Sequence, residues 1–299
     1  MDYEDVITRA AAFGAVCDAS DEATDEVAED DTDTDAAAEA RWQLIRELHQ
    51  TTDRDAFEAV VAAAKSDDRA RRLVGLDALG QISYKTDRPY LAETLPVLLD
   101  AVSDQDAEAV ASAVTALGHV ADPRGLPAVL QHVGHADDEV RFAVAVALPA
   151  LTDSEKPAAD VTDALITLTR DPDPEVRDWA TFGLGTQLHA DGPEVRDALA
   201  ARLADDYDDA AEEAMMGLAR RGDPRARAAL LDRLCRLADD DSVRPGTLEL
   251  FEAVAISRTT DALPPLRRLW QRRDGLEPSA RRMLAETLAT LGEPVEPKS

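Results

Sequence analysis

The chain has 299 residues, of which 45% are apolar but only 4% aromatic. Alanine and leucine carry most of the apolar content, which suits closely packed helices better than a β-sandwich, whose strands favour β-branched and aromatic side chains. The formal charge of −29 excludes a general affinity for nucleic-acid backbones and for anionic membrane surfaces, because both require surplus lysine and arginine. Partners are therefore expected to be neutral or basic.

Residues 1–17 predict a short amphipathic helix, with apolar residues such as Val6 and Ile7 at helical spacing. The segment starts acidic and has no long apolar run or small-residue cleavage site, so we expect neither a signal peptide nor a membrane span. Cys17 and Cys235 lie far apart without metal-binding or redox spacing. Two reduced thiols in a cytoplasmic protein are the interpretation that follows.

Residues 18–39 contain eleven aspartates and glutamates and no lysine or arginine. Such a run repels itself and cannot bury enough apolar surface to fold, so it predicts a disordered acidic linker. The alternating aspartates of residues 31–35 imitate the start of a calcium loop. However, Ala36 stands where the loop needs glycine and Trp42 where it needs glutamate, so a solvated linker is the preferred interpretation.

Residues 40–292 are periodic, and a short tail, residues 293–299, follows them. Similar residue pairs end successive apolar stretches at intervals of 31 to 38 residues: Leu79-Gly80, Leu117-Gly118, Leu148-Pro149, Leu184-Gly185, Leu218-Ala219, Val254-Ala255 and Leu291-Gly292. Another apolar helix is expected before each: Asp55–Ala64, Leu91–Val102, Leu126–Val133, Ala159–Thr169, Glu194–Leu203, Arg225–Leu237 and Leu263–Trp270. This period, without strand-like alternation, predicts a stack of helical pairs.

The segment Asp171–Gly185 predicts the second helix of one such pair together with its start signal. Asp173 can cap the helix, and Pro174 has the fixed φ that suits the first helical position. The pair Leu184-Gly185 is expected to close the helix with a C-terminal glycine.

Three turn-plus-helix units, Asp67–Gly80, Asp137–Leu151 and Asp171–Gly185, resemble bacterial HEAT repeats of the short, phycobilin-lyase-like type, in the armadillo-like superfamily. The resemblance covers about Arg41 to Gly292. It implies an all-α fold, a right-handed α-solenoid of about seven HEAT-like helical pairs, with first helices outside and second helices lining a concave face. These motifs are specific for fold and unspecific for function.

The sequence lacks the motifs that would indicate catalysis or metal binding in a protein of this type. The di-iron hydroxylases among HEAT-like proteins carry His-Glu pairs on facing helices, because iron needs both imidazole and carboxylate ligands. No histidine of this chain is followed by glutamate, and this excludes di-iron hydroxylase activity. His132 and His135 could share a helix face with Asp137 and Asp138 nearby, but two exposed histidines in a turn are the preferred interpretation. We therefore expect no catalytic residue, no cofactor and no metal site.

The second helices carry an expected binding surface opposite their buried face. Apolar residues recur there in the central repeats, with carboxylates one turn away, and the expected partner-binding residues are Glu139, Phe142, Val146, Glu175, Asp178, Phe182, Glu212 and Met216. Such a stripe suits an amphipathic basic helix or an extended peptide. Packing between repeats is the alternative interpretation, and Trp179 is expected to be structural.

Arg72, Arg141 and Arg177 occupy the same repeat position. A ladder that binds an anionic ligand is one interpretation. Pairing with turn aspartates such as Asp137, Asp171 or Asp173 is the preferred one, because the ladder is interrupted and its surroundings are acidic.

Together these features predict a non-enzymatic protein–protein interaction scaffold, monomeric and cytoplasmic, that binds a neutral or basic protein or peptide. The alternative is an enzyme or enzyme-maturation accessory of the HEAT-like lyase type, which rests on the resemblance alone. A further hypothesis is that the N-terminal helix folds back onto the solenoid as a tethered pseudo-ligand.

Overall fold

The computed structural model describes residues 3–21, 42, 45, 46, 48, 53–82, 89–239 and 247–295. All regular secondary structure in these ranges is helical, which confirms the all-α class. The chain divides into two compact units, unit 1 (Met1–Asp153) and unit 2 (Ser154–Ser299), and the predicted repeat domain, residues 40–292, spans both. No helix in the described ranges is long and apolar enough to cross a membrane.

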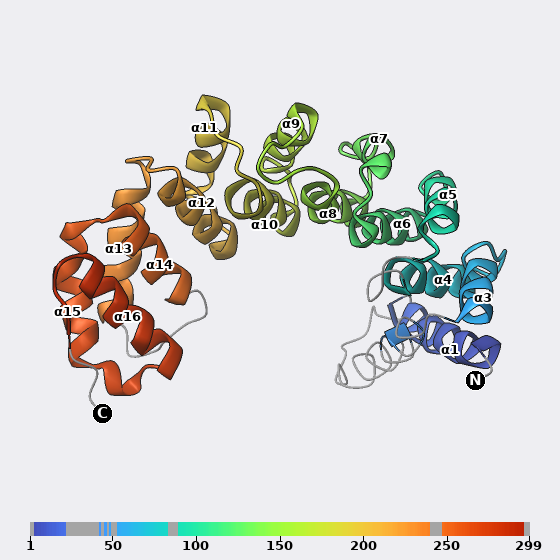
Figure 1. Ribbon diagram of the computed structural model, residues 1–299, viewed down its shortest axis with the longest axis horizontal. Helices are drawn as coiled ribbons and strands as arrows, with labels where there is room; N and C mark the ends of the chain where they lie inside the picture. The colour runs from blue at the N-terminus through green and yellow to red at the C-terminus, as the bar shows by residue number, and fades with distance from the viewer. Residues whose placement is uncertain are drawn as a thin grey trace. The chain divides into compact units, whose positions relative to one another are not determined.

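Unit 1 contains three helical pairs preceded by α1 (Tyr3–Asp21). The pairs are α3 (Arg54–Ala64) with α4 (Arg69–Ile82), α5 (Leu91–Ala101) with α6 (Ala107–Val120), and α7 (Leu126–Leu130) with α8 (Asp138–Ala147). The short helices η1 (Pro123–Gly125) and η2 (Leu148–Leu151) flank the last pair. The second helices α4, α6 and α8 pack on one another in order, and each first helix packs beside its own partner (Figure 1).

The N-terminal helix α1 packs on α3 and α4. It buries Val6 and Ile7, with 2% and 0% of their surface exposed. The Tyr3 hydroxyl donates to Asp53 at 3.2 Å. In unit 1 the helix therefore acts as a cap of the stack, and the pseudo-ligand hypothesis gains no support from this packing. It also continues to Asp21, four residues past the predicted boundary at 17, and residues 22–39 of the predicted linker lie outside the described ranges.

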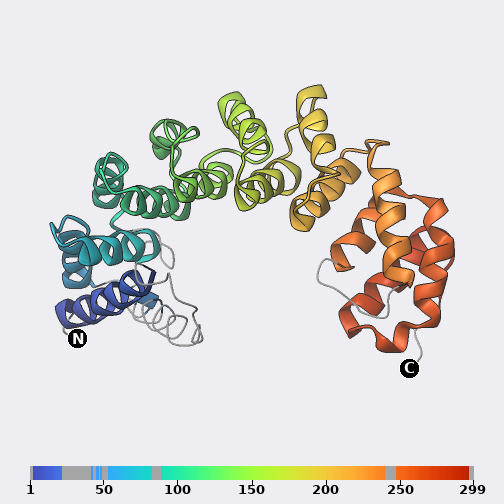
Figure 2. The ribbon, with the colours of Figure 1, turned by 180° about the vertical axis from the view of Figure 1, so that it is seen from behind.

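Unit 2 contains four helical pairs. They are α9 (Ala159–Leu168) with α10 (Pro174–Phe182), α11 (Pro193–Arg202) with α12 (Asp208–Arg220), α13 (Ala226–Asp239) with α14 (Thr247–Ser257), and α15 (Leu263–Gln271) with α16 (Pro278–Thr290). Three short helical segments complete it: η3 (Gly183–Gln187), η4 (Thr260–Ala262) and η5 (Arg273–Gly275). The second helices again pack in order, and α14 and α16 lie side by side in orange and red in Figure 2. The described ranges thus hold seven pairs, as predicted for an α-solenoid.

Aspartates in the turns cap the second helices α6, α8 and α10, as the sequence predicts, whereas α12 and α16 begin without a side-chain cap. The Asp173 carboxylate accepts from the backbone N–H groups of Glu175 and Val176 at 2.9 and 3.0 Å, and Pro174 occupies the first helical position. Asp106 accepts from Glu108 in the same way before α6. Each cap satisfies donors that the first helical turn leaves unpaired.

The glycines of the leucine–glycine pairs do not close most of these helices, so the closing-glycine prediction is wrong at Gly80, Gly118 and Gly185. Both α4 and α6 continue two residues past their glycine. α6 ends instead at Ala121, which adopts the left-handed conformation with a φ of 53°. Among the glycines of these pairs, only Gly292, with a φ of 90°, has the conformation expected of a closing glycine.

Close packing of consecutive second helices explains these glycines. A Cβ atom on Gly80 would lie 2.7 Å from the Cα of Ala116, and one on Gly118 would lie 2.9 Å from the Cα of Ala147. A Cβ atom on Gly217 would lie 2.7 Å from the Cα of Gly185. The absent side chains let neighbouring helices approach closely, which is a tertiary requirement rather than a local one.

The repeated arginines bind the carbonyl oxygens of their own turns, and Arg72 and Arg177 also join their turn to the next repeat. Arg177 donates to both carboxylate oxygens of Asp205 at 2.8 and 2.9 Å and to the carbonyl oxygen of Asp171 at 3.1 Å. Arg72 and Arg141 also donate to carbonyl oxygens six residues before them, and Arg72 pairs with Asp104 at 3.1 Å. The structural interpretation of the ladder is therefore confirmed, with turn carbonyls and the aspartate of the following turn as partners.

The segment after α10 is a π-helical turn, in which the Leu188 N–H donates to the carbonyl oxygen of Gly183 at 3.0 Å. The wide turn leaves several carbonyl oxygens without intrahelical donors. Arg221, which directly follows α12, satisfies them by donating at 2.7 to 3.1 Å to the carbonyl oxygens of Leu184, Gly185, Leu188 and Ala190. One half-buried guanidinium group thus caps the end of another helix.

Candidate binding pocket

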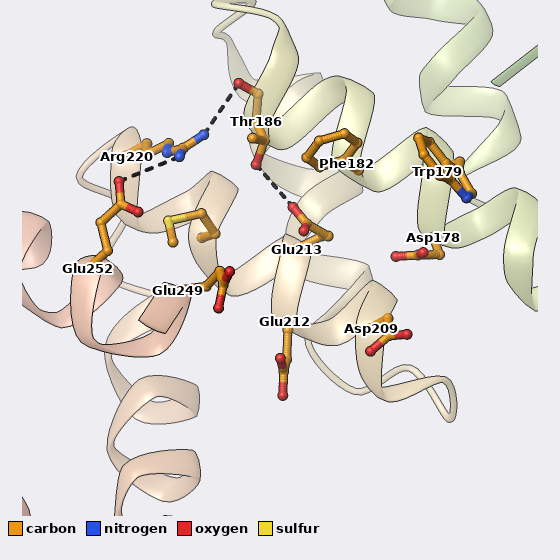
Figure 3. A pocket seen from close by; sticks show the side chains of 11 residues that line it. Asp178, Trp179, Phe182, Thr186, Asp209, Glu212, Glu213, Arg220, Glu249 and Glu252 are labelled. Carbon is orange, nitrogen blue, oxygen red and sulfur yellow. Dashed lines mark hydrogen bonds and ion pairs between the residues drawn. The ribbon is translucent and has the colours of Figure 1, made fainter. Parts of the chain in front are cut away.

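Unit 2 carries a pocket of about 540 Å³ on its row of second helices. Three helices, α10, α12 and α14, and the turn η3 supply its lining: Asp178, Trp179, Phe182, Thr186, Asp209, Glu212, Glu213, Met216, Arg220, Glu249 and Glu252 (Figure 3). The volume lies within the range of about 300–1,000 Å³ that is typical of ligand sites. We call this the unit-2 pocket.

The apolar part of the unit-2 pocket comes from α10 and α12. The rings of Trp179 and Phe182 meet edge to face, with centroids 5.7 Å apart and planes at 88°. Met216 is almost buried, with 4% of its surface exposed. This aromatic pair, three residues apart on one helix, fixes the Phe182 ring at the side of the pocket.

Six carboxylates and one cation line the same pocket. Arg220 donates to the carbonyl oxygen of Thr186 at 3.3 Å and pairs with Glu252 at 3.6 Å. The Thr186 hydroxyl donates to Glu213 at 3.0 Å. Glu212 pairs with Arg233.

Three of the carboxylates have no positive partner among the residues that the structure describes. Asp178, Asp209 and Glu249 form no ion pair with any cation in the described part of the chain. They lie on α10, α12 and α14, so each of three successive repeats contributes one. The unit-2 pocket therefore combines an aromatic wall with uncompensated negative charge.

The acidic surroundings act most strongly on Asp178. Burial, followed by repulsion from Asp209 and Glu213, raises the pKa of the Asp178 carboxyl to about 7. Burial also raises the pKa of Glu213 and of Glu212. Near neutral pH this side of the pocket holds fewer negative charges than a count of carboxylates implies.

Asparagine in place of Asp178 is expected to stabilise unit 2 by about 1 kcal/mol more at about pH 8 than at about pH 5. A carboxyl whose pKa is raised by folding binds more protons in the folded state than in the unfolded state. Stability is therefore lost as the pH rises from the ordinary aspartate pKa to about 7, and asparagine has no such loss. Urea unfolding followed by circular dichroism at both pH values measures the difference.

The matched control for this measurement is Asp208→Asn, because Asp208 is exposed and does not line the pocket. That variant is expected to keep the wild-type dependence on pH. An equal gain from Asp178→Asn at the two pH values would contradict the raised pKa.

Unit 1 carries a second, smaller pocket of about 480 Å³ on its own second helices. Its aromatic residues are Trp42 and Phe142, and its carboxylates are Asp77, Glu108, Asp137 and Glu139. The Trp42 side chain is 40% exposed. Each unit thus presents aromatic and acidic side chains together.

Six of the eight predicted binding residues line one of the two pockets, and the other two line neither. Asp178, Phe182, Glu212 and Met216 line the unit-2 pocket, and Glu139 and Phe142 line the pocket of unit 1. Val146 is half-buried on α8 and Glu175 is exposed on α10, and neither lines a pocket described above. Met216 is buried, which agrees with the packing alternative at that one position.

Sequence reasoning missed several residues of the unit-2 pocket. Trp179 was expected to be structural, yet it lines the pocket beside Phe182. Glu213 and Arg220 were recognisable in principle, because helical spacing places them on one face of α12 with Met216 and with Asp209, one of the carboxylates expected one turn from the apolar residues. Glu249 and Glu252 come from a repeat whose sequence departs from the pattern, so no alignment signal marked them.

The histidine pair of unit 1 lies in the turn before α8. The rings of His132 and His135 are 5.8 Å apart, and the Nδ1 atom of His135 accepts from the backbone N–H of Asp137 at 3.1 Å. The pair thus lies in a turn, as the preferred interpretation expects, but the prediction that both histidines are exposed is wrong, because both are half-buried.

The ordered packing of successive helical pairs defines an α-solenoid. A family model described as HEAT repeats matches residues 95–167 and 162–252, which together make up more than half of the chain. The chain belongs to the HEAT-repeat family.

Comparisons with individual proteins agree with this assignment. Protein YibA of Escherichia coli K12 is 33% identical over 95 residues, which are 32% of this chain and 32% of YibA. The chain thus matches about a third of the length of its curated relatives. The solved structure of E. coli YibA covers 85% of this chain and 87% of its own, at 23% identity and a TM-score of 0.63. That degree of likeness shows the fold alone.

Two further solved structures are more distant. An engineered protein has a TM-score of 0.51 at 16% identity, covering 98% of this chain and 95% of its own. The complex of CpcE and CpcF of phycocyanin lyase from Nostoc sp. PCC7120 has a TM-score of 0.45 at 17% identity, covering 88% of this chain and 91% of its own. Neither carries an argument about function.

Proposed function

We propose that this protein is a non-enzymatic scaffold that binds a neutral or basic protein or peptide at the unit-2 pocket. One observation carries the proposal: Asp178, Asp209 and Glu249 stand without ion pairs from the described chain around a fixed aromatic ring. Aromatic anchors rimmed by charge are typical of recognition surfaces. In this proposal the protein acts as a cytoplasmic monomer.

The charge of the whole chain supports the same partner class. A net charge of −29 attracts basic partners and repels acidic ones, which raises the rate of encounter more than the final affinity. The alternative of an enzyme or enzyme-maturation accessory still rests on the resemblance of the repeats to lyase-type proteins. No feature of the described pockets favours it.

Photo-crosslinking in cells that make the protein tests this function. The crosslinking residue p-benzoylphenylalanine in place of Phe182 is expected to capture specific partner proteins. The same residue in place of Thr167, which is exposed on the first helix α9, is expected to capture none of them. The same crosslinked species at both positions would contradict a binding role for the pocket.

A charge reversal at Asp209 is expected to lower the yield of those crosslinks about fivefold, because it replaces an attractive charge at the pocket by a repulsive one. Asp208→Lys is the matched control. Both residues are exposed in the first turn of α12, so both changes remove the same favourable interaction with the helix dipole and change the net charge equally. Of the two residues, only Asp209 lines the pocket. Equal losses from Asp209→Lys and Asp208→Lys would show that only the net charge matters.

A further inference from the structure

An arginine of unit 1 shows how this chain holds a guanidinium group. The Arg54 guanidinium carbon lies 5.5 Å from the ring centroids of both Phe57 and Tyr90. Its Nη atoms donate to the two oxygens of Glu93 at 2.7 Å, and its Nε atom donates to Glu58 at 2.7 Å. Two aromatic rings contact the cation and two carboxylates bind its N–H groups.

The unit-2 pocket has the same kinds of group, aromatic rings and carboxylates, without an arginine over its Phe182 ring in the described chain. The paired aromatic ring of Phe182 lines this pocket together with the carboxylates of Asp178, one turn earlier on α10, and of Asp209 on α12 (Figure 3). No lysine or arginine of the described chain lies over the Phe182 ring. Arg220, the one cation that lines the pocket, is held by Thr186 and Glu252 instead.

We propose that the unit-2 pocket binds the guanidinium group of a partner's arginine against the Phe182 ring, with Asp178 and Asp209 as hydrogen-bond acceptors. This proposal rests on the proposed function and names the chemistry of the partner. A guanidinium group fits better than an ammonium group, because it is planar, stacks on rings and presents several N–H donors to separate carboxylates. The pocket volume of about 540 Å³ also admits chain on either side of the arginine.

Binding of the cation is coupled to proton release from Asp178. The titratable groups that face the Asp178 carboxyl are all acids. They are Glu175 on α10, Asp209 and Glu213 on α12, and Asp205 and Tyr207 in the turn before α12. The negative charge of Asp205 is neutralised by Arg177. The turn η3 has no titratable residue, and the aspartates of α9 are exposed on the first helix. A bound guanidinium group is thus the positive charge that favours ionised Asp178, so affinity rises with pH across the pKa of about 7.

Methionine methyl NMR provides a direct test on the full chain. The chain has four methionines, of which Met216 lines the pocket and Met283 lies on α16 outside it. The probes are N-acetyl-arginine amide, N-acetyl-lysine amide and the uncharged citrulline counterpart. The arginine probe is expected to shift the Met216 signal saturably, with an affinity about fivefold higher than that of the lysine probe. The citrulline probe is expected to leave it unchanged.

Two variants identify the groups responsible. Phe182→Leu and Asp178→Asn are each expected to weaken the arginine probe about fivefold, whereas Asp208→Asn is expected to leave it as in wild type. Circular dichroism checks that each variant is folded. Between about pH 6 and about pH 8 the affinity is expected to rise about threefold in wild type and to stay constant in Asp178→Asn.

Equal affinity for the arginine and lysine probes, equal shifts of the Met216 and Met283 signals, or unchanged binding by folded Phe182→Leu would each overturn the arginine proposal. Crosslinking at Phe182 distinguishes the two levels of inference. Persistent crosslinks without arginine binding would leave the scaffold function standing with a different ligand chemistry. Loss of the crosslinks together with arginine binding would remove both.

Discussion

Alanine in place of Gly75 is expected to destabilise unit 1 by about 3 kcal/mol. Gly75 lies in α4, where it faces the backbone of α3. A Cβ atom at this position would lie 2.6 Å from the carbonyl carbon of Ala63 and from the Cα of Ala64. Backbone atoms cannot rotate away as a side chain can, so α3 and α4 must separate and lose buried apolar contacts such as those of Val60.

Urea unfolding gives the loss of stability, and hydrogen exchange followed by mass spectrometry locates it. Amides of α3 are expected to lose protection first, because α3 is the helix displaced. Gly134→Ala is the control in the same unit, since a Cβ atom there meets nothing within 4 Å. That change is expected to alter stability by less than about 0.5 kcal/mol. An unchanged unfolding midpoint for Gly75→Ala would mean that the two helices are not packed as described.

Methionine in place of Arg177 is expected to destabilise unit 2 by about 3 kcal/mol. The Asp205 side chain is only 1% exposed and would keep Arg202 and the Tyr207 N–H as partners while losing its bidentate arginine. The Asp171 carbonyl oxygen would lose a donor as well. An uncompensated buried carboxylate is costly even when another cation remains nearby.

The dependence on pH supplies a second signature of this ion pair. The hydrogen bond from Arg177 holds the pKa of Asp205 below its ordinary range. The ion pair therefore makes its full contribution to the free energy of unfolding above the unfolded aspartate pKa of about 3.9. That contribution is lost as the pH falls through the lower pKa of Asp205 in the folded state. The difference between wild type and Arg177→Met is expected to shrink below about pH 4.

Controls for Arg177 come from the same unit. Arg227 pairs with Asp261 at the surface, where both side chains are more than half exposed. Arg227→Met is expected to cost less than about 0.5 kcal/mol. In the double variant Arg177→Met with Asp205→Asn, part of the loss is expected to be recovered, because the buried carboxylate that lost Arg177 is no longer charged. Strictly additive losses would indicate that the pair is not coupled.

The sequence predicted the helical pairs well because their signals are local. Asp173 and Pro174 start a helix by interactions within a few residues, and apolar spacing reports which face of each helix is buried. The role of Gly80 was misread for the opposite reason. Its requirement comes from Ala116, a residue of the next repeat, and no local pattern separates a packing glycine from a capping one.

The candidate pocket was only partly predictable for a related reason. Phe182 and Asp178 stood out because helical spacing places them opposite the expected buried face of their helix. Glu249 joins them only because α14 packs beside α12, and its repeat lacks the usual start motif. The shift in the pKa of Asp178 was equally out of reach, because burial and the charges of a neighbouring helix cause it.

The π-helical turn at Gly183–Gln187 links the backbone of one repeat to the side chain of the next. Its exposed carbonyl oxygens are satisfied by Arg221, and no neutral side chain offers as many donors in that fan-shaped arrangement. Evolution is therefore expected to change these two features together. In relatives in which the equivalent of helix α10 ends in an ordinary α-helical turn, the residue at the position of Arg221 no longer has to be arginine. The kind of turn that ends one helix is then reflected in the residue type found about one repeat later in the sequence.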